Sequence, residues 1–251
     1  MNDLCILVVT HKEFHFKSTP GYFPISVGPK SHEIKNVFFL DDTKINISNK
    51  NDYYCELTAL YWGWKNLDFK FFGLNHYRRF FKEKINGVSS ILSASSVENI
   101  LNDFQIIVPK PRFYLEGVKK HYINSLKSQK RENEIHIFLL KQVIGQIQPE
   151  YSSFFDSQMR NKHPHMFNMF IMSKTLSDKY CEWLFSILFP LEKSLKKNNV
   201  LTPRTIGALS EFMLDVWIKK NNIKYLEVPV LSTDSNLFKK TLFAIKRRFS
   251  R

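Results

Sequence analysis

The stretch Leu4-Cys5-Ile6-Leu7-Val8-Val9, near the start of the chain, is short and entirely apolar, and it ends at Thr10-His11-Lys12. An apolar run of this length without polar alternation is typical of a strand that is buried on both faces. We therefore predict a buried strand over residues 4–9, with three polar side chains at its carboxyl end.

Segments of strand and helix character alternate along the rest of the chain. Strands are predicted over residues 37–40, 69–74, 104–108, 166–172 and 225–231. Helices are predicted over residues 53–66, 95–103 and 176–196, along the stripe Ile206, Leu209, Met213 and Trp217, and with interruptions over residues 118–150. Residues 18–36 are rich in Pro, Gly, Ser and Lys and read as a loop. This order predicts an α/β fold with a mostly parallel central sheet flanked by helices, in which ligands bind beyond the carboxyl ends of the strands.

Two helices carry boundary signals. Ser95-Ser96-Val97-Glu98 fits a capping box that opens the helix over residues 95–103. Pro190 predicts that the helix over residues 176–196 bends or ends near this position.

The charge of the chain is its unusual feature. Its 251 residues include 37 Lys and Arg against 23 Asp and Glu, which gives a formal charge of +14. The excess predicts an anionic partner: nucleic acid, a phosphorylated ligand or an anionic membrane face. A composition of 43% hydrophobic and 24% charged residues is typical of a globular protein and argues against a disordered one.

Several classes of protein are not expected. No signal-peptide core is found, and no apolar run approaches the roughly 18 uncharged residues of a membrane-spanning helix. Cys5, Cys55 and Cys181 are far apart and form no paired framework. We therefore expect a cytoplasmic protein without a disulfide or a membrane span.

The first candidate group is Thr10-His11-Lys12. A hydroxyl, an imidazole and an amine at the end of a buried strand suit contact with a nucleotide or phosphate. A polar strand end that only meets solvent is the alternative.

The second candidate group is His76-Tyr77-Arg78-Arg79, directly after the strand predicted over residues 69–74. Arg78 and Arg79 supply planar, permanently charged donors that suit a diphosphate. A solvated basic turn, or an arginine paired with a structural carboxylate, would have the same sequence.

Asp41-Asp42 follows the strand predicted over residues 37–40 and suits a divalent metal, a ribose hydroxyl or only a strand cap. No cluster with metal-ligand spacing is present, which argues against structural zinc. Mg²⁺ or Mn²⁺ needs only one or two carboxylates beside a substrate phosphate, so the spacing leaves these ions open. The sequence lacks the motifs of P-loop, Rossmann cofactor and serine hydrolase sites.

Glu211 lies in Gly207-Ala208-Leu209-Ser210-Glu211-Phe212 and faces away from the apolar stripe. It is a general base if the helix end points into a cleft, and a solvated helix residue if it does not. His163-Pro164-His165, ahead of Asn168, leaves two similar readings: one histidine lines a cleft, or both belong to a loop.

The end of the chain, residues 237–251, has six basic residues and no acidic one, with Leu242, Phe243, Ile245 and Phe249 between the charges. A helix of this composition lies flat on an anionic membrane. A nucleic-acid-binding tail and a disordered basic end are the alternatives, and the large apolar residues favour the membrane. We therefore divide the chain into a catalytic domain, residues 1–236, and a basic tail, residues 237–251.

Three stretches carry a resemblance to a known family: Asn46-Ile47-Ser48-Asn49-Lys50-Asn51, Tyr54-Cys55-Glu56-Leu57-Thr58-Ala59-Leu60-Tyr61-Trp62-Gly63-Trp64-Lys65-Asn66 and Gly73-Leu74-Asn75-His76-Tyr77-Arg78-Arg79. Together they resemble a bacterial polysaccharide glycosyltransferase family, long catalogued as a domain of unknown function and associated with galactofuranosyl transfer in capsule, exopolysaccharide and O-antigen assembly. Residues 4–12, 166–172 and 204–211 match this family as well, so the resemblance covers nearly the whole chain except the basic tail.

The resemblance implies an A-type glycosyltransferase fold, UDP-galactofuranose as donor and inversion at the anomeric carbon. It implies that Glu211 deprotonates the acceptor hydroxyl and that the diphosphate is held by Arg78, Arg79 and Arg204. The uridine or ribose would meet Thr10, His11 and Lys12, and the sugar would meet Asn168. Further donor-binding candidates are Asp42, Lys50, Asn51 and His76, and acceptor-binding candidates are Tyr77 and His165.

Two positions depart from the pattern of the family. Where related folds carry a metal-binding Asp-x-Asp, this chain has Asn75-His76-Tyr77, so no metal cofactor is expected, with Mg²⁺ or Mn²⁺ on Asp41 or Asp42 as the alternative. Phe212 follows Glu211 at a position where the family usually has an arginine.

The implied partners are a UDP-sugar, a lipid-linked glycan acceptor and the anionic inner face of the cell membrane, reached peripherally through the basic tail. No residue identifies the ring form of the sugar, so a UDP-pyranose donor is the alternative within the same fold. A basic nucleic-acid-binding protein and a non-catalytic scaffold are alternatives of other classes. No nucleic-acid-binding motif appears in the sequence, so nucleic acid is not expected as a partner.

Overall fold

A computed structural model describes residues 3–16, 18–125 and 130–233 of the chain. The predicted basic tail, residues 237–251, lies outside this part. The main sheet has the strand order β3-β2-β1-β4-β8-β7-β9. In that order the strands are Phe39–Leu40, Tyr22–Ser26, Leu4–Thr10, Phe71–His76, Phe170–Ser173, Ile106–Pro109 and Tyr225–Val228.

The direction of the strands confirms the predicted α/β fold with a mostly parallel sheet. Strands β3, β2, β1 and β4 are parallel neighbours, and β7 is parallel to β9. Only β8, among these strands, runs antiparallel to both of its neighbours. Strand β1 is buried along its whole length, and Leu7 pairs with Phe23 on β2 and Leu74 on β4. The carboxyl ends of β1 and β4 therefore lie side by side.

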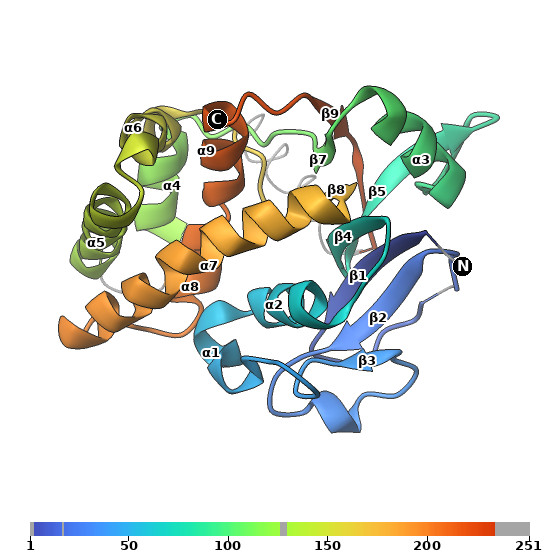
Figure 1. The fold of residues 1–251 in the computed structure, drawn as a ribbon, viewed down its shortest axis with the longest axis horizontal. Helices are drawn as coiled ribbons and strands as arrows, with labels where there is room; N and C mark the ends of the chain where they lie inside the picture. Colours follow the sequence, from blue (N-terminus) through green and yellow to red (C-terminus); the bar gives the residue numbers. More distant parts are fainter. Residues whose placement is uncertain (1–2, 17, 126–129, 234–251) are drawn as a thin grey trace, which may run out of the picture.

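Helices and a hairpin cover the two faces of this sheet (Figure 1). Leu7 and Val9 of β1 belong to the core beneath α2 (Leu57–Asn66) and α7 (Lys174–Lys197), while Ile6 and Val8 belong to the core on the opposite face. The second face packs against α3 (Ala94–Asp103) and the hairpin of β5 (Arg79–Ile85) and β6 (Val88–Ile91), with β10 (Val230–Ser232) paired to β5.

A group of helices lies beside one end of the sheet (Figure 1). These are α1 (Asn51–Tyr54), α4 (Gly117–Ser125), α5 (Lys130–Ile147), α6 (Ser152–Arg160), α8 (Thr205–Ser210) and α9 (Met213–Lys220). Elsewhere in the described ranges, 3-10 turns lie at Ser31–Glu33, between β2 and β3, at Ser48–Lys50, before α1, and at Pro149–Tyr151, before α6. No helix within the described ranges is both long and apolar enough to cross a bilayer.

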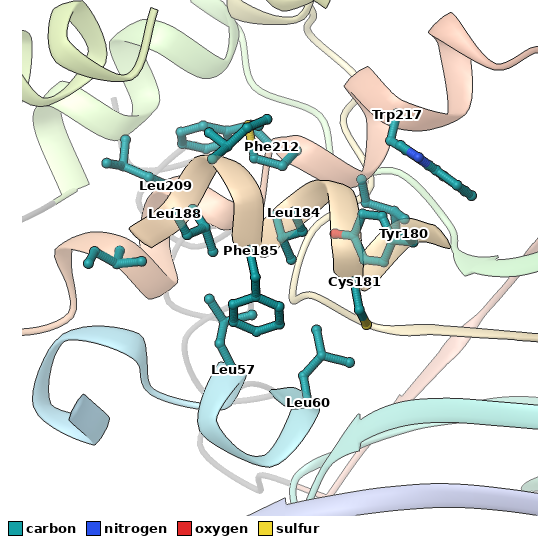
Figure 2. Close-up of a cluster of buried hydrophobic side chains, with 14 of the residues drawn as sticks. Leu57, Leu60, Tyr180, Cys181, Leu184, Phe185, Leu188, Leu209, Phe212 and Trp217 are labelled. Atoms are coloured by element: carbon teal, nitrogen blue, oxygen red, sulfur yellow. The ribbon is translucent and has the colours of Figure 1, made fainter. Parts of the chain in front are cut away.

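Helix α7 joins this group to the sheet. Figure 2 shows its side chains between α2 on one side and the α8–α9 region on the other: Phe185 lies beside Leu57, and Tyr180 lies beside Trp217. The ring centroids of Tyr180 and Trp217 are 5.3 Å apart. Helix α2 can approach the sheet closely because residue 63 is glycine, where a Cβ would lie 2.7 Å from side-chain atoms of Leu7 and Phe72.

Two helices differ from their predicted boundaries. The helix predicted over residues 53–66 is broken at Cys55, whose left-handed φ of 52° separates α1 from α2. The prediction of a capping box that starts at Ser95 is wrong. The helix begins at Ala94, and the N-cap is Ser93, whose side chain accepts a hydrogen bond from the Ser96 N–H.

Pro190 neither ends α7 nor marks its last turn, since the helix continues to Lys197. Proline removes one backbone hydrogen bond. Burial of the flanking residues Ile187, Leu188 and Leu191 outweighs that loss.

The predicted loop over residues 18–36 contains β2, whose short run Tyr22–Ser26 includes Pro24 and is enclosed by turn-forming residues. The apolar stripe over residues 206–217 is two helices, α8 and α9, with Glu211 and Phe212 between them. The strand predicted over residues 166–172 begins only at Phe170, because Phe167 and Asn168 have left-handed φ angles of 81° and 54°.

Candidate active site

The polar ends of β1 and β4 form the first half of the site. Val9 pairs with His76, and the Tyr77 N–H donates a 3.0 Å hydrogen bond to the Val9 carbonyl. Tyr77 and Arg78 are the two turn residues between β4 and β5, since His76 pairs with Arg79. This tight turn places Arg78 beside the residues that follow β1.

Cations gather around the ring of Tyr77. Lys12 Nζ lies 5.5 Å from the ring centroid, Arg78 Cζ lies 5.1 Å from it, and the imidazole of His11 packs edge-on at 5.5 Å. Burial lowers the pKa of His11, and the charges of Lys12, Arg78 and Arg204 lower it further. The strand ends therefore present a concentrated positive charge, as an anionic ligand requires.

The loop before β8 forms the second half of the site. The Phe167 carbonyl accepts a 2.7 Å hydrogen bond from His76 Nε2, and the Phe167 N–H donates a 3.0 Å bond to Glu211 Oε2. The left-handed backbone of Phe167 and Asn168 turns these groups toward the two side chains. One peptide segment thus connects the end of β4 with Glu211.

Glu211 is half-buried at the junction of α8 and α9 and is not a solvated helix residue. Burial, together with the nearby charge of Glu56, raises the pKa of Glu211 to about 7. The Phe167 N–H and Arg79 act in the opposite direction. A carboxyl group with a pKa near neutrality is suited to general base chemistry.

His76 is neutral in this environment. Burial lowers its pKa to about 4, although the hydrogen bond with the Phe167 carbonyl acts against the shift. A carbonyl oxygen only accepts hydrogen bonds, so Nε2 of His76 carries the ring hydrogen. His76 therefore orients the loop before β8 and adds no positive charge.

Glu56 is a site residue that the sequence did not single out. Its Oε1 accepts a 2.6 Å hydrogen bond from Asn168 Nδ2 and lies 4.0 Å from His76 Nε2. Burial raises the pKa of Glu56, while Asn168, Arg204 and Arg79 oppose the rise. In the sequence Glu56 stands within an apolar helical run, and only the break at Cys55 distinguishes it.

Close packing fixes the position of that break. A Cβ on Gly207 would lie 3.1 Å from both Cys55 Cβ and the Tyr54 carbonyl oxygen, so α8 rests on the α1–α2 junction because residue 207 has no side chain. The contact brings Glu56 and Glu211 into one site although 155 residues separate them in the chain.

Arginines border this site. Arg204 precedes α8 with a left-handed φ of 68°, its N–H bonded to the Asp52 carbonyl at 2.7 Å. Arg79 Cζ lies 4.2 Å and Arg112 Cζ 5.4 Å from the ring centroid of Phe167. Arg112 and Phe167 were not singled out as candidates, although Phe167 lies in the stretch 166–172 that carries the family resemblance.

The amide of Asn168 is fully engaged by protein groups. Besides Glu56, its Nδ2 donates to Ser210 Oγ at 2.9 Å, and its Oδ1 accepts from the same hydroxyl at 3.2 Å. Asn168 is buried, and in this structure its amide supports Glu56.

Four predicted donor-binding residues have other partners. Lys50 Nζ lies 2.8 Å from Glu192 Oε2, and Asp42 Oδ2 lies 2.5 Å from His32 Nε2. The Asn51 amide donates to the Cys55 carbonyl and Thr58 Oγ1, both at 3.0 Å. Thr10 is buried, and its hydroxyl donates to the Lys12 carbonyl. Lys50, Asp42 and Asn51 are therefore engaged by protein groups, and Thr10 shapes the end of β1.

His165, a predicted acceptor-binding residue, lies in a buried network. Its Nδ1 is 2.5 Å from Asp215 Oδ1 and its Nε2 is 3.2 Å from Glu227 Oε1. Burial lowers the pKa of His165, but the hydrogen bonds and charges of Asp215 and Glu227 outweigh it and raise the pKa overall. Because both of its ring nitrogens have protein partners, His165 fixes the loop before β8.

The next question is whether the described residues could hold a metal ion. Among the described residues, no three His, Cys, Asp or Glu side chains are arranged to hold a metal ion. Asp41 is buried, and its Oδ1 accepts a 2.7 Å hydrogen bond from Ser48 Oγ. The carboxylates of the site itself are Glu56 and Glu211.

The chain is similar to known proteins over most of its length. The model of a family described as a domain of unknown function, DUF4422, matches residues 5–222. An apo structure of WbbM, described as a bifunctional glycosyltransferase, superposes with a TM-score of 0.78 at 26% sequence identity. The match covers 93% of this chain and 46% of that one, so the chain spans about half the length of its structural relative. No protein of curated function matches the chain.

Proposed function

The chain belongs to the DUF4422 family, and we propose that it is an inverting glycosyltransferase that transfers galactofuranose from UDP-galactofuranose to a hydroxyl of a lipid-linked polysaccharide intermediate. The observation that carries the proposal is the carboxylate of Glu211, with a pKa of about 7, held by the Phe167 N–H in a site that also contains a cation cluster. The fold of a bifunctional glycosyltransferase over 93% of the chain supports the reaction class.

In the proposed reaction Glu211 acts as the general base. Its carboxylate takes the proton of the acceptor hydroxyl while the hydroxyl oxygen forms a bond to the anomeric carbon and the bond from that carbon to UDP breaks. A single displacement of this kind inverts the anomeric configuration. Because the pKa of Glu211 is about 7, a substantial share of the group is ionised at neutral pH and still basic enough to take the proton.

The cations Lys12, Arg78 and Arg204 would hold the diphosphate of the donor. Negative charge grows on the leaving diphosphate, and fixed positive charges stabilise that change without reorganisation. The ring of Tyr77, predicted as an acceptor contact, is buried among Phe14, His11, Lys12 and Arg78, and it would position the cations. Glu56 would act through Glu211, because its charge raises the pKa of the base.

The donor and the acceptor class rest on the motif resemblance described for residues 46–79. A UDP-pyranose donor is the alternative within the same reaction. We further propose that residues 237–251 attach the enzyme peripherally to the inner face of the cell membrane, where a lipid-linked acceptor resides. Truncation after Asn236 is then expected to weaken binding to anionic liposomes, and unchanged binding would reject this role of the tail.

A panel of UDP-sugars, assayed for UDP release and for transfer with and without EDTA, tests the proposal. We expect turnover of UDP-galactofuranose and loss of about 100-fold or more in kcat for Glu211→Gln, which keeps the shape of the side chain. Glu182→Gln, at an exposed position on α7, is the matched control and should keep full activity.

The same panel separates the alternatives. Turnover of a UDP-pyranose in place of the furanose would change the donor and keep the reaction class, and inhibition by EDTA would reveal a metal. Absence of turnover with every UDP-sugar, together with tight and salt-sensitive RNA binding, would replace the enzyme with a nucleic-acid-binding protein.

A further inference from the structure

Residues 110–116 form the loop between β7 and α4, and two large apolar side chains in it are exposed to solvent. Phe113 is 62% exposed and Leu115 is 73% exposed. Exposed apolar residues of this size in adjacent outward positions mark a contact surface more often than isolated ones do.

The backbone of this loop is fixed, so the exposure is part of its structure. The N–H groups of Lys110, Arg112 and Tyr114 donate to the carbonyls of Val228, Pro164 and Lys162, at 2.9, 3.0 and 2.8 Å. The ring of Tyr114 stacks on His121 with centroids 3.7 Å apart. On this fixed backbone Phe113 and Leu115 stay exposed, with the Phe113 ring centroid 5.3 Å from that of His163.

The surroundings of the two apolar side chains are basic. Residues 110–120 contain Lys110, Arg112, Lys119 and Lys120 against one acidic residue, Glu116. Glu116 is itself paired with Lys120 at 2.9 Å. Exposed Lys162 lies opposite the loop, where its carbonyl binds the Tyr114 N–H.

We propose that the 110–116 loop inserts Phe113 and Leu115 into the interface of an anionic lipid bilayer while the surrounding lysines bind the headgroups. Apolar side chains on a cationic surface are the combination that binds to anionic membranes, since burial of apolar area adds to electrostatic attraction. This contact is separate from residues 237–251, and it does not depend on the donor sugar.

The loop would also position the candidate active site at the membrane. Arg112 lies over the ring of Phe167, whose N–H holds Glu211, so the lipid contact begins beside the candidate base. A bilayer seated on Phe113 and Leu115 would bring membrane-bound molecules to the edge of the site.

Depth-dependent quenching in vesicles tests the insertion directly in the full-length protein. Phe113→Trp is compared with Phe38→Trp, because Phe38 is 70% exposed and lies beside the edge strand β3, in a different part of the chain. Both variants keep an aromatic side chain and the native tryptophans. With vesicles of phosphatidylglycerol and brominated phosphatidylcholine, we expect loss of fluorescence for the residue at position 113 and none for the one at position 38. Equal quenching of the two would overturn the proposal.

Vesicle sedimentation measures the contributions of the apolar and the basic residues. F113S/L115S should bind phosphatidylglycerol vesicles less tightly than F38S/V88S, whose replaced side chains are 70% and 68% exposed. Lys110→Gln with Lys162→Gln should weaken binding by about 25-fold, at about fivefold for each cation, whereas Lys35→Gln with Lys44→Gln should not. Unchanged vesicle binding by F113S/L115S, or a change only in self-association or RNA binding, would reject the lipid surface.

Discussion

The carboxylates of Glu56 and Glu211 lie in one site, and after burial the charge of Glu56 is the largest cause of the raised pKa of Glu211, which is about 7. The pair comes from the α1–α2 junction and the α8–α9 junction, and it is held together by Asn168 and the Phe167 peptide. Glu56 and Glu211 have different roles in the proposed reaction, so their replacement should change different measured properties of the enzyme.

Removal of the charge on Glu56 should shift the pH dependence of the reaction. In Glu56→Gln the pKa of Glu211 falls, so the base stays ionised to lower pH and the acid limb of the kcat/KM profile moves to lower pH. A pH series of initial rates measures the shift, with Glu182→Gln as a control that should match the parent protein. An acid limb that stays in place would show that Glu56 does not act on the base.

Replacement of Glu211 should stabilise the fold in alkaline solution. A carboxyl group whose pKa rises from 4.5 to about 7 on folding contributes stability below pH 4.5, and that contribution is lost as the pH rises toward 7. The Glu211→Gln side chain does not ionise, so the variant keeps its stability at high pH. Its free energy of unfolding at pH 8 should exceed that of the parent protein by ~1–2 kcal/mol, allowing for partial solvent exposure.

Urea unfolding at pH 4.5 and pH 8 gives the comparison. The difference between Glu211→Gln and the parent should shrink at the lower pH. A stabilisation that is equal at both pH values would contradict the assignment of the raised pKa to Glu211.

Replacement of Arg78 should lower the affinity for the donor more than it slows the chemical step. A charge-assisted hydrogen bond contributes about 1.5–3 kcal/mol, so Arg78→Gln should raise the dissociation constant of UDP by about 10- to 100-fold. Calorimetric titration of UDP measures the effect, and Lys35→Gln, at an exposed position, is the control. If UDP binds both variants equally well, the diphosphate does not lie at the β4–β5 turn.

Lys50 should prove structural. Its ammonium pairs with the buried carboxylate of Glu192, which also accepts hydrogen bonds from Lys196 and Tyr54. Lys50→Met should therefore lower the free energy of unfolding by ~1–3 kcal/mol and leave the donor KM unchanged. A raised donor KM with unchanged stability would restore the donor-binding role predicted from the sequence.

The sequence predicts the parts of the fold that depend on local pattern. The apolar run of β1, the strand before His76 and the amphipathic length of α7 are each determined by residues close together in the chain. Tertiary packing decides the rest. The strand β2 is short and contains Pro24, so its pairing with β1 is what identifies it.

The candidate site follows the same division. His11, Lys12, Arg78 and Glu211 were predicted as candidates, because polar residues at strand ends and next to motif positions are visible in the sequence. Glu56 joins them only through a left-handed turn at Cys55 and the missing side chain at Gly207. Contacts between residues that are more than a hundred positions apart leave no local signal.

The contacts of Phe167 with His76 and Glu211 are made by its main chain. Scanning mutagenesis replaces side chains one at a time and leaves peptide groups in place. An alanine scan of this protein would therefore report the loss of ring stacking at position 167 and overlook the group that orients the carboxylate. Only a change to the peptide itself, such as an ester in place of the amide at that position, would expose its contribution.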